Sequence, residues 1–207
     1  MYITKTRPNK FNLITNFRQV KKLLESGKIF CAFDTETTGL KSETERIIEL
    51  GAIKFNKDGI IDSMGTLINP QKSISPLASS INHITNEMVQ FSPTEESVIP
   101  EFINFSKDCI LVAHNAQFDI RFVNQSLLRL GMEELQNPAI DTLRFSRWAL
   151  PSNGHWKLQF LAEQFKIDTG NAHRAQDDAR VCMEIFLKLA EIEPTKRLSR
   201  AALLQDQ

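Results

Sequence analysis

The chain has 207 residues, a formal net charge of zero, 42% hydrophobic residues and 24% charged residues. These values are ordinary for one medium-sized globular domain, and they exclude intrinsic disorder, a coiled coil and a collagen-like chain. A protein without net positive charge does not bind nucleic acid through bulk charge. The sequence contains no apolar run of the roughly 20 residues that cross a membrane and no apolar segment typical of a secretory signal, so we expect a cytoplasmic protein without a membrane partner.

The three cysteines, Cys31, Cys109 and Cys182, lie apart in apolar surroundings and lack the spacing of a C-x-x-C motif. Such residues are typical of buried thiols in a reducing compartment. We therefore expect neither a disulfide framework nor a zinc site built from cysteines.

Residues 1–27 are predicted to form a basic N-terminal segment, with a helix over 11–26 that ends at Gly27. Two interpretations of its charge remain open: a solvated helix face, or a surface that meets phosphate groups. Against the single acid Glu25, residues 1–28 carry seven basic side chains: Lys5, Arg7, Lys10, Arg18, Lys21, Lys22 and Lys28.

Three antiparallel strands are predicted to follow. Residues 29–36 form a nearly continuous apolar run, as expected of a central strand that is buried on both faces. Residues 47–55 and 60–68 are rich in β-branched side chains, and Asn56-Lys57-Asp58-Gly59 between them is typical of a hairpin turn.

Helices and short strands alternate in the second half of the chain. Ser92-Pro93-Thr94-Glu95 has the spacing of a capping box, so a helix is predicted to begin there, and Pro100 is expected to kink or interrupt it. Short buried strands are predicted over 110–113 and 139–141. Further helices are predicted over residues 116–130, 142–149, 158–165 and 174–190.

This order of elements predicts a single α/β domain with a mixed sheet, in which three antiparallel strands are followed by parallel ones. We place the domain at residues 28–192 and a short polar and basic tail at 193–207. The sequence shows no internal repeat and no linker that would separate two domains.

Carboxylates occur where the pattern predicts apolar side chains. Asp34 and Glu36 share one face of the first strand and extend the row of Phe30 and Ala32 toward its C-terminal end. In α/β sheets, functional sites are built at that end of the strands. On the helix that follows the 110–113 strand, Asp119 shares a stripe with apolar residues.

The last helix presents a further acid. Asp178 belongs to the row of Cys182, Ile185 and Leu189, whereas Asp177 points about 100° away. Asp178 is therefore predicted to face inward and Asp177 to be an ordinary surface residue. A single acid on an apolar stripe is often a helix cap, but three elements that each direct acids inward indicate a site.

Four carboxylates that meet in one place repel one another, which raises some of their pKa values and destabilises the fold. Divalent cations relieve this repulsion, and a ligand set of oxygen atoms suits Mg²⁺ or Mn²⁺ better than zinc. Two such ions can hold the attacking and the leaving oxygen of a phosphodiester displacement. The acids therefore predict metal-assisted hydrolysis at phosphorus.

This hydrolysis also needs a general base for the attacking water. His83 lies in a predicted loop and His155 stands beside a tryptophan, and each alone is more typical of a structural or surface residue. His114 ends a strand and is expected to orient the next loop. His173 lies five residues before Asp178 in the loop that enters the last helix, so it is the best candidate for the base.

Three segments occur in order on the predicted strand and two helices: Asp34-Thr35-Glu36-Thr37-Thr38-Gly39, His114-Asn115-Ala116-Gln117-Phe118-Asp119 and His173-Arg174-Ala175-Gln176-Asp177-Asp178-Ala179. Together they resemble the three motifs of the DEDDh 3′→5′ exonucleases, a family that includes the proofreading subunit of bacterial replicative polymerases. The resemblance spans roughly residues 28–190 and includes the connecting segments 45–51, 82–85 and 140–143.

The resemblance implies a ribonuclease-H-like fold and a set of site residues. Asp34, Glu36 and Asp178 would ligate two Mg²⁺ or Mn²⁺ ions, Asp119 would complete the site directly or through water, and His173 would be the base. Four residues match the family positions that hold the terminal nucleotide: Thr37, Leu40, Asn115 and Phe118. Phe118 is equally open to interpretation as a plain core residue.

We therefore expect a metal-dependent 3′→5′ exonuclease that releases nucleoside monophosphates from a single-stranded or frayed DNA end, in proofreading or repair. Two alternatives remain: an RNA-trimming exoribonuclease of the same family, and an idle nucleic-acid-binding accessory of a polymerase. The five intact catalytic positions favour an enzyme. It is expected either to act alone or to dock on a DNA polymerase subunit through the domain itself.

Overall fold

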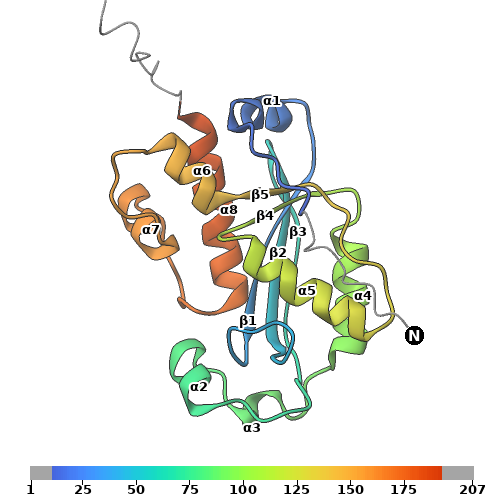
Figure 1. Ribbon diagram of the computed structural model, residues 1–207. Coiled ribbons are helices and arrows are strands. Elements are labelled where there is room, and N and C mark those ends of the chain that lie inside the picture. Colours follow the sequence, from blue (N-terminus) through green and yellow to red (C-terminus); the bar gives the residue numbers. More distant parts are fainter. Residues whose placement is uncertain (1–10, 193–207) are drawn as a thin grey trace, which may run out of the picture.

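The computed structural model describes residues 11–192, which form a five-stranded mixed sheet of order β3-β2-β1-β4-β5 (Figure 1). The central strand β1 pairs antiparallel with β2 and parallel with β4. Three antiparallel strands followed by parallel ones are the predicted topology, which is thus confirmed. The strands are β1 (Phe30–Thr37), β2 (Ile47–Asn56), β3 (Gly59–Leu67), β4 (Ile110–Ala113) and β5 (Ala139–Asp141).

Helices cover both faces of the sheet. Figure 1 shows α6, α7 and α8 on one side and α4 and α5 on the other. Among residues 11–192, no helix is both long and apolar enough to cross a bilayer. The helices are α1 (Val20–Glu25), α2 (Pro76–Asn82), α3 (Asn86–Val89), α4 (Glu95–Phe105), α5 (Gln117–Arg129), α6 (Thr142–Ala149), α7 (Leu158–Phe165) and α8 (Ala175–Glu191).

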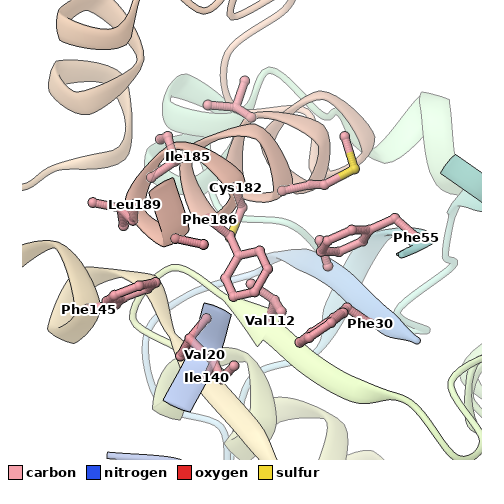
Figure 2. Packing of buried hydrophobic residues seen from close by; sticks show 14 of the residues in the cluster. Val20, Phe30, Phe55, Val112, Ile140, Phe145, Cys182, Ile185, Phe186 and Leu189 are labelled. Atoms are coloured by element: carbon pink, nitrogen blue, oxygen red, sulfur yellow. The ribbon is translucent and has the colours of Figure 1, made fainter. Parts of the chain in front are cut away.

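Strand β1 separates two hydrophobic cores because its side chains alternate between the faces of the sheet. Phe30 and Ala32 face the core under α8, where the rings of Phe30 and Phe186 lie 5.1 Å apart (Figure 2). Cys31 and Phe33 face the core under α4 and α5. Burial on both faces explains why the sequence of this strand is a nearly continuous apolar run.

Helix α8 lies directly against β2 and β3 at a pair of glycines. Gly51 and Gly65 stand opposite each other in the two strands. A Cβ atom on Gly51 would lie 2.3 Å from the backbone nitrogen of Gln176, in the first turn of α8. The N-terminal turn of α8 therefore approaches the sheet as closely as a backbone can.

The N-terminal segment differs from the prediction of a helix over 11–26. The chain turns helical only at Phe17, in a 3₁₀ turn that leads into α1. Before it, Leu13 bridges to Ala139, and the Ile14 amide donates to the Ala139 carbonyl. Pairing with the exposed edge of β5 satisfies backbone groups there, and this tertiary contact overrides the local helical pattern.

The basic side chains in and next to α1 do not line the carboxylate end of the sheet. Arg18, Lys21, Lys22 and Lys28 are exposed near the start of β1, whereas Asp34 and Glu36 lie at its other end. Figure 1 shows α1 at the opposite end of the sheet from α2 and α3. The described basic side chains therefore do not lie beside the acids, and both interpretations of their charge, a solvated helix face or a surface that meets phosphate, stay predictions; Lys5, Arg7 and Lys10 lie outside the described residues.

Helix α4 also departs from its prediction. It begins at Glu95 after Thr94, and it continues through Pro100 to Phe105 without interruption. Pro100 removes one backbone donor, but Val98, Ile99 and Phe102 are buried and hold the helix on the core. Helices α2 and α3 were not predicted, whereas β1 to β5 and α5 to α8 match their predicted positions to within one or two residues.

We expect Gly51→Ala to destabilise the protein by at least the roughly 1–3 kcal/mol typical of overpacking, because the methyl group meets the backbone of α8. Gly65→Ala is the matched control. Its Cβ would lie 2.7 Å from Gln176 Oε1, the tip of a flexible side chain that can rotate away. Urea unfolding measures both variants. Equal losses of unfolding free energy would contradict the close contact between α8 and β2.

Candidate active site

Two of the site carboxylates lie in the C-terminal half of β1. Asp34 and Glu36 follow Phe30 and Ala32 on the face toward α8, and both side chains are partly exposed. They therefore stand where the apolar core ends and solvent begins. The alternation that buries the first half of the strand also directs these two acids to one place.

Asp119 reaches the same place from the other side of the sheet. It lies in the first turn of α5 and is 3% exposed. Its Oδ1 atom accepts hydrogen bonds from the Thr35 amide at 3.1 Å and from the Thr35 hydroxyl at 2.8 Å. Thr35 lies between Asp34 and Glu36 in β1. Its hydrogen bonds to Asp119 therefore hold that carboxylate close to the two acids.

Asp178 lies in the first turn of α8, and both of its oxygens accept hydrogen bonds. Oδ1 accepts from the Gln159 side-chain amide at 3.1 Å, and Oδ2 accepts from the His173 backbone amide at 3.1 Å. One potential ligand atom each from Glu36, His173 and Asp178 lies within 4.8 Å of the others, so these three residues can hold a metal ion. The His173 side chain is exposed, and its backbone adopts a φ of 63°.

Burial raises the pKa values of all four acids, and the charges of neighbouring acids raise them further. Burial, followed by the charges of Asp178, Glu49 and Asp119, raises the pKa of Glu36 to about 8. Burial also raises the pKa of Asp119 to about 7, against the opposing effect of the Thr35 hydrogen bonds. The pKa values of the Asp34 and Asp178 carboxyls are raised as well, chiefly by burial. Oxygen ligands that repel one another in this way fit a divalent cation.

Glu49 is a further acid of this cluster, and the sequence reasoning missed it. It stands opposite Glu36 in the β1–β2 register and is 5% exposed. It accepts hydrogen bonds from Arg174 Nη2 at 2.7 Å and from the Ala175 amide at 2.9 Å. Glu49 thus anchors the start of α8 and the residue after His173. The sequence feature that could have revealed it is an acid within the otherwise apolar 47–55 strand.

Asp177 points away from the carboxylates, as the helical period predicts, but it is not an ordinary surface residue. Its Oδ2 accepts a hydrogen bond from the Asn171 amide at 3.0 Å. Asp177 therefore fixes the loop that leads to His173. Helical periodicity cannot predict this hydrogen bond, because it depends on how the loop before α8 folds back over the helix.

The residues expected to hold a terminal nucleotide differ in their surroundings. Thr37 is buried at the end of β1 and donates its hydroxyl hydrogen bond to the Gly39 carbonyl at 2.7 Å. Leu40 is 85% exposed, which is unusual for so large an apolar side chain. Asn115 is exposed with a φ of 64°, directly before α5. Phe118 is half-buried and its ring lies 4.9 Å from that of Phe122, so it contributes to the core as well.

The other three histidines have different surroundings from His173. His114 Nδ1 lies 2.9 Å from the Thr142 hydroxyl, and burial lowers the pKa of His114 to about 4. His83 adopts a left-handed conformation at the C-terminus of α2. His155 is exposed, with its ring 5.5 Å from that of Phe160. Among the four histidines, His173 alone stands within the group of potential metal ligands that the described residues form.

Fold and site together define a class of enzyme, the metal-assisted nucleases, whose acids converge at one end of a central strand. The chain belongs to the exonuclease family, whose model matches residues 31–186. It is 46% identical over 159 residues to DNA polymerase III subunit epsilon of Treponema pallidum, and the match covers 76% of this chain and 74% of that relative. The resemblance inferred from the three motifs is thus confirmed.

Other relatives are much longer. The chain is 40% identical over 162 residues to the PolC-type DNA polymerase III of Caldanaerobacter subterraneus, and the match covers 78% of this chain but 12% of that protein. Among solved structures, exonuclease X in complex with 5′-overhanging duplex DNA matches with a TM-score of 0.64 and 28% identity, over 77% of this chain and 90% of that one. Exonuclease I of E. coli, with a dA16 oligonucleotide, matches at a TM-score of 0.69 and 18% identity, over 79% of this chain and 41% of its own, and supports the ribonuclease-H-like fold alone.

We expect Asp178→Asn to lose measurable turnover, because it removes one of the converging charges, while Asp177→Asn stays within a few-fold of the unmodified protein. The matched Asp177→Asn variant keeps an oxygen that can accept the Asn171 hydrogen bond. Initial rates with Mg²⁺ and calorimetric Mn²⁺ binding measure both. A dead Asp177→Asn protein beside a live Asp178→Asn protein would contradict this geometry.

The raised pKa values predict the direction in which stability depends on pH. Glu36 keeps its proton to about pH 8 in the folded protein, against an ordinary value of 4.5. The folded state then binds more protons than the unfolded state between these values, so in chelator the free energy of unfolding should fall as pH rises through this window. Melting temperatures with EDTA and with Mg²⁺ test this. The difference between them should widen from about pH 5 to about pH 9; a constant difference would contradict it.

Proposed function

We propose that this chain is a metal-dependent 3′→5′ exonuclease that removes nucleoside monophosphates one at a time from the end of DNA. The observation that carries the proposal is the convergence of carboxylates from β1, α5 and α8 with His173 beside them. Membership of the exonuclease family supports hydrolysis of terminal phosphodiester bonds.

Asp34, Glu36, Asp119 and Asp178 would hold two Mg²⁺ or Mn²⁺ ions. The donor set fits these ions because its atoms are carboxylate oxygens whose pKa values are raised by burial and repulsion. When bound, such ions supply positive charge to the attacking and the leaving oxygen of a phosphodiester displacement. The protein contributes their placement through the hydrogen bonds that fix Asp119 and Asp178.

His173 would take the proton of the attacking water. Its side chain is exposed, and one ring nitrogen lies within 4.8 Å of carboxylate oxygens of Glu36 and Asp178. Its backbone is fixed by the hydrogen bond to Asp178 and, one residue later, by the Arg174–Glu49 ion pair. The loop therefore positions an imidazole that stays in contact with solvent, as a general base requires.

Thr37, Leu40, Asn115 and Phe118 would form the pocket for the terminal nucleotide. Leu40 offers an exposed apolar surface at the end of β1, on which a base or sugar can pack. Packing of this kind tolerates any base. A paired terminus must first unstack, so frayed or single-stranded ends should be the better substrates.

DNA as the substrate, in proofreading or repair, is supported by two relatives. One is named as a subunit of DNA polymerase III, and the exonuclease X structure holds duplex DNA with a 5′ overhang. We therefore propose a DNA polymerase subunit as the partner if the protein does not act alone, with cytoplasmic DNA ends as its substrates.

The test is a ladder assay with 5′-labelled DNA, matched or mismatched at the 3′ end, and RNA of the same sequence. Stepwise shortening from the 3′ end of DNA, faster on the mismatch, is expected. His173→Ala should lower the rate by roughly 10²–10⁴, the range of general-base catalysis, with Mn²⁺ binding largely preserved because the four carboxylates remain. His83→Asn is the control, since asparagine tolerates its left-handed backbone. Internal cuts, 5′ shortening or a preference for RNA would overturn the proposal.

A further inference from the structure

A hollow of about 520 Å³ lies beside the carboxylate cluster, between the end of β4 and the loop that joins α6 to α7. Its volume is in the range of ligand sites. The loop lies on the α8 side of the sheet in Figure 1. The side chains that matter for its chemistry are those of Asn115, Arg147, His155, Trp156 and Lys157.

Hydrogen bonds hold the wall of this hollow in place. The Trp156 indole nitrogen donates to the Leu150 carbonyl at 3.0 Å, and the Asn153 amide donates to the His155 carbonyl at 2.9 Å. A further hydrogen bond joins His114 to the backbone of Trp156. The loop is therefore preorganised, and a ligand need not order it on binding.

The hollow adjoins the proposed site at two points. Asn115, one of the residues expected to hold the terminal nucleotide, also lines the hollow. On the opposite wall, Leu158 lines the hollow while the next residue, Gln159, donates a hydrogen bond to Asp178. Asn115 and the Leu158–Gln159 pair thus place the hollow next to the residues proposed to hold the last nucleotide.

The lining matches single-stranded nucleic acid in charge and in stacking surface. Arg147 and Lys157 are exposed, and neither forms an ion pair within the part of the chain that the structure describes. The Arg147 guanidinium lies 5.7 Å from the Trp156 ring. The described residues that line the hollow include no acid. Aromatic rings beside cations form the usual platform for bases and phosphates of a single strand.

We propose that this hollow is an upstream subsite, which binds the second and third nucleotides from the 3′ end while the last one occupies the active site. The inference rests on the proposed function. Lys157 and Arg147 contact the phosphates and Trp156 stacks on a base. The exposed lysines of α1 lie at the far end of β1, whereas Arg147 and Lys157 line a hollow that shares Asn115 with the proposed site.

The experiment compares a substrate that fills the subsite with one that lacks the phosphates and bases the subsite would bind. The first is a single-stranded DNA 12-mer, and the second is the p-nitrophenyl ester of thymidine 5′-monophosphate, whose small leaving group replaces the second nucleotide and carries no further phosphate. Trp156→Ala should raise KM for the 12-mer roughly tenfold, as loss of one stacked base does. Lys157→Ala should raise it too, and should reduce the slope of log KM against log salt by about 0.7. The KM of the ester should change by less than twofold in both. Lys188→Ala, at the far end of α8, is the charge-matched control and should alter neither substrate.

Three outcomes in these variants would overturn the proposal of an upstream subsite. The first is an equal change in KM for both substrates, and the second is an unchanged KM for the 12-mer. The third is inhibition by thymidine monophosphate that weakens in parallel with binding of the 12-mer. The last result would identify the hollow as a product site. Lys157→Ala keeps the test decisive if Trp156→Ala misfolds, because Lys157 is exposed. An unmodified protein that cleaves neither substrate with Mg²⁺ or Mn²⁺ would instead contradict the proposed function itself.

Discussion

Repulsion among acids at the end of β1 is the constraint on which the rest of the structure depends. Asp34, Glu36, Asp119, Asp178 and Glu49 interact electrostatically in a partly buried place, which disfavours their charged forms. The fold holds them by giving individual oxygens fixed donors. Thr35 donates to Asp119, Gln159 donates to Asp178, and Arg174 donates to Glu49. These donors hold the acids in place while the raised pKa values show that much of the repulsion remains.

Such a cluster persists only if the elements that carry it cannot move apart. The two cores on either face of β1 fix α5 and α8 independently, so Asp119 and Asp178 are positioned by different sets of apolar contacts. The contact of Gly51 with the first turn of α8 sets the height of Asp178 and His173 above the sheet. Burial thus supplies the rigidity that binding or catalytic groups require. The loop before α8 remains the exposed part, and its geometry depends on Glu49 and Asp177.

Local patterns in the sequence predicted the elements that the cores require. Strand β1 is buried on both faces and reads as a continuous apolar run, and the acids Asp34 and Glu36 break that run where it reaches solvent. Helix α2 carried a readable signal, Ser75 before Pro76, in which the Ser75 hydroxyl accepts from the Ala78 amide. Residues 11–16 could not be predicted, because their conformation depends on the distant edge of β5. Glu49 was missed for the same reason: cross-strand register places it opposite Glu36, and Arg174, which pairs with it, lies 125 residues away.

The distribution of charge around the site bears on how a protein of zero net charge can engage a polyanion. Long-range attraction is weak in such a protein, so affinity must arise from local contacts. At the catalytic end of the sheet the protein itself presents a cluster of acids, which repels phosphate until cations are bound there. Arg147 on α6 and Lys157 just before α7 line the neighbouring hollow; the loop between these helices contacts His114, and Gln159 on α7 contacts Asp178. The same short stretch of chain, from α6 to the start of α7, therefore carries two cations and also contacts the acidic cluster. In the proposed reaction, cations and acids on neighbouring elements would attract a strand along its length while its last phosphate lies at the acids.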